Sequence, residues 1–199
     1  MLEAITLGLI QGITEWLPVS SEGIVAATSH IFFDKDPIEA ILFALWLHMG
    51  TALAAIIAFN SNIKNYLKEL RSNPKELSPT LRFLICSCLL SGIIGGSLIL
   101  IISHFSNNTV AAIMQYFMTT LGVFMTISGI VLMLNNKRFV PRILSTQPWL
   151  DSIIVGSAQG FAVIPGLSRS GLTISALLVR KFDTREALTL SFLMSIPAS

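Results

Sequence analysis

Charged residues are scarce in this sequence: only 12% of its 199 residues are Asp, Glu, Lys or Arg, while 53% are hydrophobic. Soluble globular domains are about a quarter charged. The scarcity therefore excludes an ordinary soluble domain and indicates a membrane protein. The formal net charge of +2 is also too small to indicate a nucleic-acid partner.

Cysteine is nearly absent, with only Cys86 and Cys88 in one apolar run. Residues two positions apart point in different directions on a helix, which excludes a redox or metal pair and favours a packing role. A basic segment is missing at the N-terminus, where Glu3 stands instead, so no cleavable signal peptide is predicted.

Long apolar runs, in contrast, are abundant. Ile38–Phe59, Leu81–Ser103 and Val110–Leu134 are each long enough as a helix to cross about 30 Å of hydrocarbon. A fourth run begins at Glu186. These runs predict an all-α, polytopic membrane protein that forms one domain over residues 1–199.

An internal repeat divides this domain. The segment Gly8–Gly23 resembles Gly156–Gly171, with matching glycines and glutamines at one constant offset and matching prolines at an offset one residue shorter. Repeat one covers about residues 1–134, and a partial repeat two covers about residues 149–199. Internal repeats in an apolar chain are typical of membrane proteins built from two related halves, with the site where interrupted helices meet.

Two pairs of shorter apolar segments are broken at prolines: Leu2–Leu17 with Ser20–Phe33, and Trp149–Ile164 with Ser170–Val179. Proline disfavours helix in the residue before it, and serine caps the helix that follows. We interpret both pairs as re-entrant helical hairpins, whose irregular tips must lie in protein or in a wet cavity. The alternative is two kinked spanning helices.

The distribution of basic residues predicts orientation. Asn60–Thr80 and Asn135–Pro148 are rich in Lys and Arg, whereas His104–Thr109 has neither, so the first two are predicted to be cytoplasmic and the third external. Three spans then separate the hairpins, which therefore enter from opposite faces as an inverted repeat. Helical spacing of apolar residues between the lysines of Asn60–Thr80 predicts a short helix on the inner membrane surface.

Polar residues gather at both hairpin tips. The candidates are Gln11, Glu15, Ser20, Ser21 and Glu22 at the first tip, and Gln159, Ser168, Arg169, Ser170 and Thr173 at the second. Guanidinium, hydroxyl groups and helix N-termini bind phosphate. The carboxylates would repel a phosphate unless a divalent cation bridges them or one acts as a base. The competing interpretation is a structural ion pair between Glu15 and Arg169.

Two motifs carry a family resemblance. Gln11–Ser21 and Pro165–Thr173 resemble the signature motifs of the undecaprenyl-diphosphate phosphatase family, the integral-membrane bacitracin-resistance type, and the resemblance runs from Leu2 to the last residue. It implies hydrolysis of a polyprenyl diphosphate to the monophosphate, which recycles a lipid carrier for envelope glycans. It also implies dependence on a divalent cation, Mg²⁺ or Ca²⁺, and a site that opens to the outer face of the cell membrane.

Roles for individual residues follow from the resemblance together with the polar groups at the two tips. The catalytic candidates are Glu15, Ser21 and Arg169; the phosphate-binding candidates are Ser20, Ser168, Ser170 and Thr173; the cation ligands are Gln11, Glu15 and Glu22. One departure from the family pattern is Ile24, which stands where a histidine is usual. Glu22 or His48 is a candidate substitute base, although a structural role for His48 remains open.

Two other function classes are compatible with parts of this sequence. A transporter or flippase for an anionic polyprenyl lipid is the main alternative, because inverted repeats with broken helices are a transporter architecture. A purely structural scaffold would not explain the polar residues at two prolines. The expected partners are the polyprenyl diphosphate, membrane lipid and, as a homodimer, a second copy of the chain. Because repeat two has no counterpart of Leu53–Leu134, we expect the C-terminus to be truncated.

Overall fold

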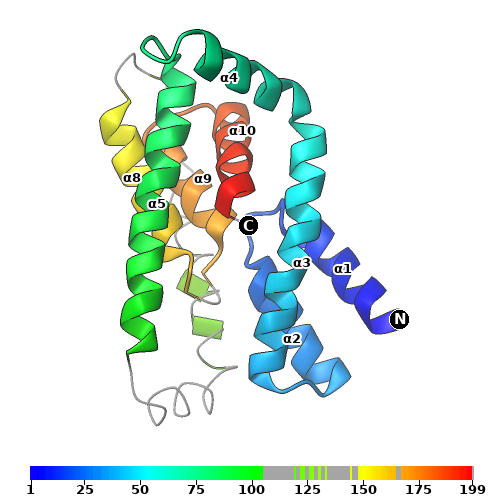
Figure 1. Ribbon diagram of the computed structural model, residues 1–199. Coiled ribbons are helices and arrows are strands. Elements are labelled where there is room, and N and C mark those ends of the chain that lie inside the picture. The colour runs from blue at the N-terminus through cyan, green and yellow to red at the C-terminus, as the bar shows by residue number, and fades with distance from the viewer. Residues whose placement is uncertain are drawn as a thin grey trace.

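The computed structural model describes residues 1–104, 148–164 and 167–198, with eight isolated positions between residues 105 and 147. This described part contains helices and no strands (Figure 1). The α-helices are α1 (Leu2–Thr14), α2 (Ser21–Phe33), α3 (Pro37–Ala58), α4 (Asn60–Ser72), α5 (Pro79–Ser103), α8 (Trp149–Phe161), α9 (Arg169–Val179) and α10 (Thr184–Ser195), and a 3-10 turn covers Ile196–Ala198. The prediction of an all-α fold is confirmed for these residues.

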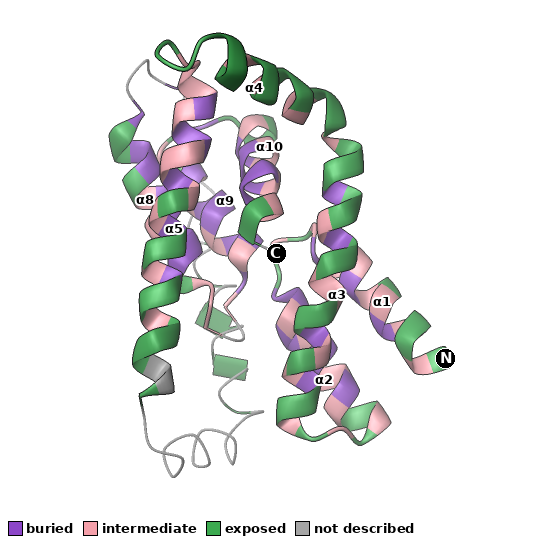
Figure 2. Cartoon of the chain, viewed as in Figure 1, coloured by how far each residue is buried: buried purple, intermediate pink, exposed green. Residues whose placement is uncertain are grey.

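Two helices are long and apolar enough to cross a membrane. They are α3 over Pro37–Ala58 and α5 over Pro79–Ile101, and only 22% of the most apolar stretch of each is buried inside the protein. Their outward sides are exposed hydrophobic surface (Figure 2), as lipid-facing helices require. Both agree with predicted spans to within two residues. The third predicted span, Val110–Leu134, and the basic loop after it lie largely outside the described residues.

The fourth predicted run differs from the expectation. It begins as helix α10 at Thr184, two residues before Glu186, and its α-helix ends at Ser195. A 3-10 turn that contains Pro197 follows. Proline lacks the backbone donor that a continuing α-helix needs, which accounts for the change at this point.

Helices α1 and α8 both end three residues earlier than predicted, at Thr14 and Phe161. After α1 the Leu17 amide donates to the Thr14 carbonyl at 3.1 Å, and after α8 the Ile164 amide donates to the Phe161 carbonyl at 3.2 Å. These i→i+3 bonds tighten each helix into a 3-10 turn before the proline. The same local chemistry therefore interrupts both hairpins.

Serine residues restart the second helix of each pair. The Ser20 hydroxyl accepts a hydrogen bond from the Gly23 amide at 3.1 Å, and the Ser168 hydroxyl accepts one from the Gly171 amide at 3.0 Å. Each serine has extended backbone angles and satisfies an amide that the first helical turn leaves free. The predicted serine caps are confirmed.

The helices pack as two groups. The N-terminal group, α1 to α3, is centred on Leu7, Val25 and Ala44. The C-terminal group, α5 with α8 to α10, has a larger core that includes Phe83, Val155, Leu177, Phe182, Ala187, Leu190 and Met194. Helix α4 crosses from one group to the other at one end of the molecule (Figure 1). The helix expected within residues 60–80 is present as α4, and none of its residues is buried. Its location on the inner membrane surface stays a prediction.

Candidate active site

The two interrupted segments meet at the interface between the helix groups. The Ser170 hydroxyl, in the first turn of α9, donates to the Leu17 carbonyl at 2.7 Å. Nearby, Trp16 packs edge-on against Phe192 of α10, with ring centroids 5.0 Å apart. The expected contact of the two tips is therefore present around Pro18, while Pro165 lies outside the described residues.

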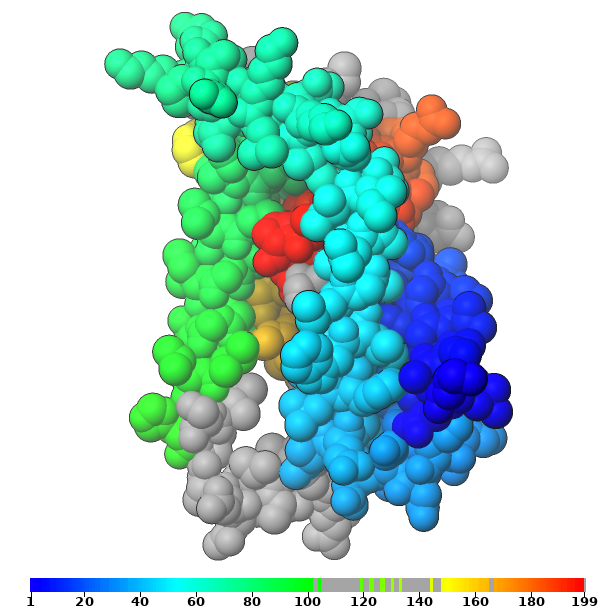
Figure 3. Space-filling view, turned by 45° about the vertical axis from the view of Figure 1, so that its right-hand side comes forward, coloured from blue at the N-terminus to red at the C-terminus, as the bar shows by residue number. Residues whose placement is uncertain are grey.

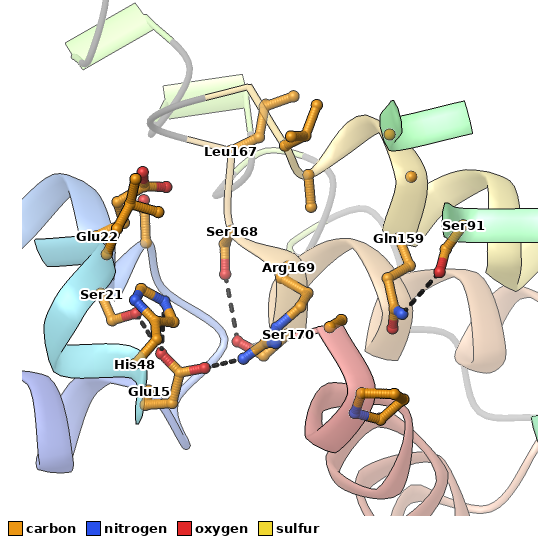
Figure 4. A pocket seen from close by; sticks show the side chains of 18 of the residues that line it. Glu15, Ser21, Glu22, His48, Ser91, Gln159, Leu167, Ser168, Arg169 and Ser170 are labelled. Atoms are coloured by element: carbon orange, nitrogen blue, oxygen red, sulfur yellow. Dashed lines mark hydrogen bonds and ion pairs between the residues drawn. The ribbon is translucent and has the colours of Figure 1, made fainter. Parts of the chain in front are cut away.

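Glu15 is the centre of the polar contacts at this interface (Figure 4). Its Oε2 atom accepts hydrogen bonds from Gln11 Nε2 at 2.8 Å and from Ser21 Oγ at 2.6 Å. Its Oε1 atom pairs with Arg169 Nη2 of the other helix group. The Glu15 side chain is only 7% exposed, so one buried carboxylate joins both motifs.

Arg169 is held on two sides. Besides its pairing with Glu15, its Nη1 atom donates to the Ser195 carbonyl at the end of α10, at 3.1 Å. The side chain is 17% exposed and lines a cavity. A planar guanidinium fixed in this way can present its donors to a phosphate in one orientation.

His48 reaches the same carboxylate from α3. Its Nε2 atom lies 3.4 Å from Glu15 Oε2, and its Nδ1 atom lies 2.9 Å from the Ala44 carbonyl oxygen. A carbonyl can only accept, so Nδ1 carries a hydrogen and Nε2 is the atom that faces Glu15. The structure thus places the predicted substitute for the motif histidine at the site.

A cavity of about 370 Å³ lies between the two tips. Most of the predicted site residues line it, namely Glu15, Ser20, Ser21, Glu22, His48, Ser168, Arg169 and Ser170. Acid, hydroxyl and guanidinium groups therefore share one cavity beside the N-termini of α2 and α9, where backbone amides favour an anion. Such a cavity is suited to bind a phosphorylated ligand and to transfer a proton.

Comparison with known proteins decides the family. Residues 4–199 match the family described as bacitracin resistance protein BacA. The chain belongs to the BacA family. It is 42% identical to an undecaprenyl-diphosphatase of Methanococcoides burtonii, over 98% of this chain and 74% of the relative. It is 39% identical to one of Saccharolobus solfataricus, over 100% and 70%, and 32% identical to one of Haloarcula marismortui, over 100% and 74%.

Two of the candidates in this BacA-family chain do not line the cavity. Gln11 is 1% exposed and lies behind Glu15. Thr173 is fully buried, and its hydroxyl lies 2.6 Å from the Ser191 hydroxyl of α10. Thr173 therefore joins α9 to α10 in this structure, and phosphate binding by Thr173 stays a prediction.

Sequence reasoning missed Ser91, which lines the cavity from α5. Its hydroxyl accepts a hydrogen bond from Gln159 Nε2 at 3.0 Å and donates one to the Cys88 carbonyl at 3.0 Å. The available signal was a serine inside a long apolar run, because polar groups in a membrane segment often mark a site.

The predicted cation ligands are oxygen donors, the type that Mg²⁺ and Ca²⁺ prefer. Glu15 and Glu22 both line the cavity, and Gln11 Oε1 is buried without a hydrogen-bond partner among the described residues. In the described ranges no group of three or more His, Cys, Asp or Glu residues is arranged to hold a metal ion. The two carboxylates and the amide oxygen nevertheless have the donor chemistry that a hard cation needs.

Proposed function

We propose that this chain hydrolyses a polyprenyl diphosphate of the undecaprenyl type to the monophosphate and inorganic phosphate. The observation that carries the proposal is the cavity in which Glu15 joins Ser21 of one motif to Arg169 of the other. The undecaprenyl-diphosphatase names of its relatives support the same reaction. The relatives reported above are all named for phosphatase activity, so the transporter alternative gains no support.

The phosphate-binding groups come from the start of α9. Arg169, Ser168 and Ser170 would donate to oxygens of the terminal phosphate, together with backbone amides at the helix N-terminus. Ser20 would contribute from the corresponding turn before α2. Because negative charge gathers on these oxygens in the transition state, fixed donors in a cavity with little water accelerate the reaction.

Ser21 and Glu15 are arranged for nucleophilic attack. The Ser21 hydroxyl already donates to Glu15 Oε2 at 2.6 Å, so this carboxylate can accept the proton as the oxygen attacks phosphorus. The phosphoanhydride bond breaks, and the polyprenyl monophosphate leaves. Two routes are consistent with this geometry. In one, Ser21 attacks phosphorus and the phosphoserine is then hydrolysed; in the other, a water activated by Glu15 attacks phosphorus directly. His48 Nε2 lies 3.4 Å from Glu15 Oε2 and would share the proton that this carboxylate accepts.

The proposal includes a divalent cation, Mg²⁺ or Ca²⁺, held by Glu15 and Glu22 with Gln11 behind them. When bound, the cation would neutralise phosphate charge and allow the carboxylates and the diphosphate to occupy one cavity. Holding the cation with these residues would not depend on a histidine at position 24.

We further propose a multi-pass cell-membrane protein with two re-entrant hairpins in an inverted repeat. Helices α1 and α2 pack together as one pair, α8 and α9 as another, and their joined ends meet in the interior of the molecule (Figure 1). Their matching 3-10 turns and serine caps support a common origin of the two pairs.

The test is phosphate release from farnesyl and longer polyprenyl diphosphates by the purified chain, with and without a chelator. We expect release that stops with chelator and returns with Mg²⁺ or Ca²⁺. Loss of release in Ser21→Ala would indicate attack by Ser21, and retained release would indicate direct attack by water. Absence of release from every prenyl diphosphate, combined with movement of a labelled polyprenyl phosphate across vesicles, would overturn the proposal in favour of transport.

A further inference from the structure

The cavity has an apolar side that phosphate chemistry does not use. Its lining also includes Leu45 of α3, Gly92, Gly96 and Ile99 of α5, and Leu167. Leu45 and Ile99 are about half exposed, at 50% and 55%. A binding site for phosphate alone has no need of this hydrocarbon surface.

Two glycines widen this apolar side. A Cβ atom built at Gly92 or at Gly96 would meet no heavy atom within 4 Å. Gly95, between them, differs because its Cβ would lie 3.5 Å from the Gly160 carbonyl of α8. Gly95 thus allows α5 and α8 to pack, whereas Gly92 and Gly96, four residues apart on one face of α5, leave space in the cavity.

The space is visible as a cleft between α5 (green) and α3 (cyan) in Figure 3, with parts of the later helices (gold and red) in its floor. Both bordering helices are long and apolar enough to cross a membrane. A ligand held in this cleft would therefore lie between two helices of membrane-spanning length.

A buried amide marks where the polar end of the cavity begins. Gln159 is 5% exposed, and its Nε2 atom donates to Ser91 Oγ at 3.0 Å and approaches the Met194 carbonyl at 3.4 Å. Its Oε1 atom has no partner in the described part of the chain. A water or a protonated phosphate oxygen of a bound molecule would satisfy this acceptor.

We propose that the cleft between α3 and α5 holds the first isoprene units of the substrate, with Gly92 and Gly96 as specificity-determining residues. The inference rests on the proposed function, since a diphosphate bound at Arg169 is covalently joined to a hydrocarbon chain that must leave the cavity. The apolar residues and the charged groups line one cavity, so a tail joined to the bound diphosphate would pass beside the two glycines. Side chains at these positions block that path.

The variants are Gly92→Leu and Gly96→Leu, with Gly50→Leu as the matched control. Gly50 also sits in a membrane-length helix, is exposed, has no atom within 4 Å of a built Cβ, and does not line the cavity. All three changes replace glycine by a stronger helix former. Where a leucine variant does not fold, Gly92→Ala and Gly96→Ala take its place.

Three quantities are measured in the full chain: KM for a long polyprenyl diphosphate, the inhibition constant of inorganic pyrophosphate, which has no tail, and the melting temperature. We expect roughly a tenfold rise in KM for the cavity variants, because binding energy is lost equally in ground and transition states. The pyrophosphate constant and the melting temperature should stay constant, and Gly50→Leu should resemble the wild type.

An unchanged KM in the cavity variants overturns the proposal that the tail lies in this cleft. So does a rise in KM that is matched by an equal rise in the inhibition constant of pyrophosphate. If the wild type releases no phosphate, the proposed function fails, and binding of a fluorescent polyprenyl monophosphate is measured instead. Weaker binding in the glycine variants then still supports the cleft as the tail site, and equal binding overturns it.

Discussion

Glu15, in the turn after α1, has four polar neighbours, one from each of the helices α1, α2, α3 and α9. Each carboxylate oxygen has two acceptor positions, so Oε2 can serve Gln11 and Ser21 while Oε1 serves Arg169. The ion pair and the proposed catalytic arrangement therefore share one carboxylate. A pair that only closed the tips would not need the Ser21 hydroxyl or His48 beside the same oxygen.

We expect Glu15 and Arg169 to depend strongly on each other in their contributions to the free energy of unfolding. In Glu15→Gln the Arg169 guanidinium stays mostly buried without a charged partner, and we expect a loss of roughly 3 kcal/mol of unfolding free energy. Arg169→Gln should behave similarly, and the double variant should lose much less than the sum. Unfolding of the four proteins in detergent completes the double-mutant cycle. Additive losses would mean that the two side chains do not depend on each other.

Arg169→Lys tests catalysis at the same position. Lysine keeps the charge but cannot present two parallel donors to phosphate. We expect kcat to fall by at least about a hundredfold, the size seen when one preorganised donor is lost, with helical content unchanged by circular dichroism. Arg185→Lys, at an exposed position in the first turn of α10, is the control. Normal turnover in a folded Arg169→Lys protein would leave Arg169 a structural role alone.

The sequence predicted some of these residue contacts and not others. Glu15, Ser21 and Arg169 could be brought together because repeat, proline and charge all point to the same two tips. The proximity of His48 and the involvement of Ser91 depend on how α3 and α5 pack against the hairpins. Helical periodicity along one segment does not contain that information.

At the scale of elements, the long helices were the most predictable, since a long apolar run has one dominant conformation in a membrane. The first helix of each hairpin was overestimated by three residues. The apolar pattern continues through Trp16 and Leu17, but the backbone there has already tightened into i→i+3 bonds. Residue types do not distinguish an α-helical turn from a 3-10 turn of the same composition.

The glycines of the repeat differ in their packing, which gives a matched pair of variants. A Cβ at Gly156 would lie 2.7 Å from the Ser87 carbonyl oxygen, whereas a Cβ at its counterpart Gly8 would meet nothing within 4 Å. Helices α8 and α5 must therefore separate in Gly156→Ala, at a cost of about 1–3 kcal/mol. Gly8→Ala should be neutral or stabilise by up to about 1 kcal/mol.

Thermal unfolding of the two alanine variants checks this difference. Both variants gain the same helix propensity, so changes of opposite sign in their melting temperatures come from the α5–α8 contact. Equal melting temperatures would show that α5 and α8 do not approach as closely as Gly156 and Ser87 do here.

At the scale of the whole molecule, the arrangement of the two helix groups makes the orientation testable. The two hairpins open toward opposite ends of the molecule, and α4, with its lysines, lies at the end toward which α8 and α9 open (Figure 1). If basic segments stay in the cytoplasm, both ends of the first hairpin are outside and both ends of the second are inside. A kinked spanning helix would instead place its two ends on opposite sides.

Single cysteines in a variant without the two native cysteines separate these arrangements. We expect Leu2→Cys and Asp36→Cys to react with an impermeant thiol reagent in intact cells. Trp149→Cys, Arg185→Cys and Lys68→Cys should react only after permeabilisation, because their positions lie on the side of the basic α4 helix. All five positions are exposed at the protein surface, so the membrane alone decides their access. If positions 2 and 36 are labelled from opposite sides of the membrane, or positions 149 and 185 are, that helix pair is a kinked span and not a re-entrant hairpin. The inverted repeat would then be removed from the proposed fold.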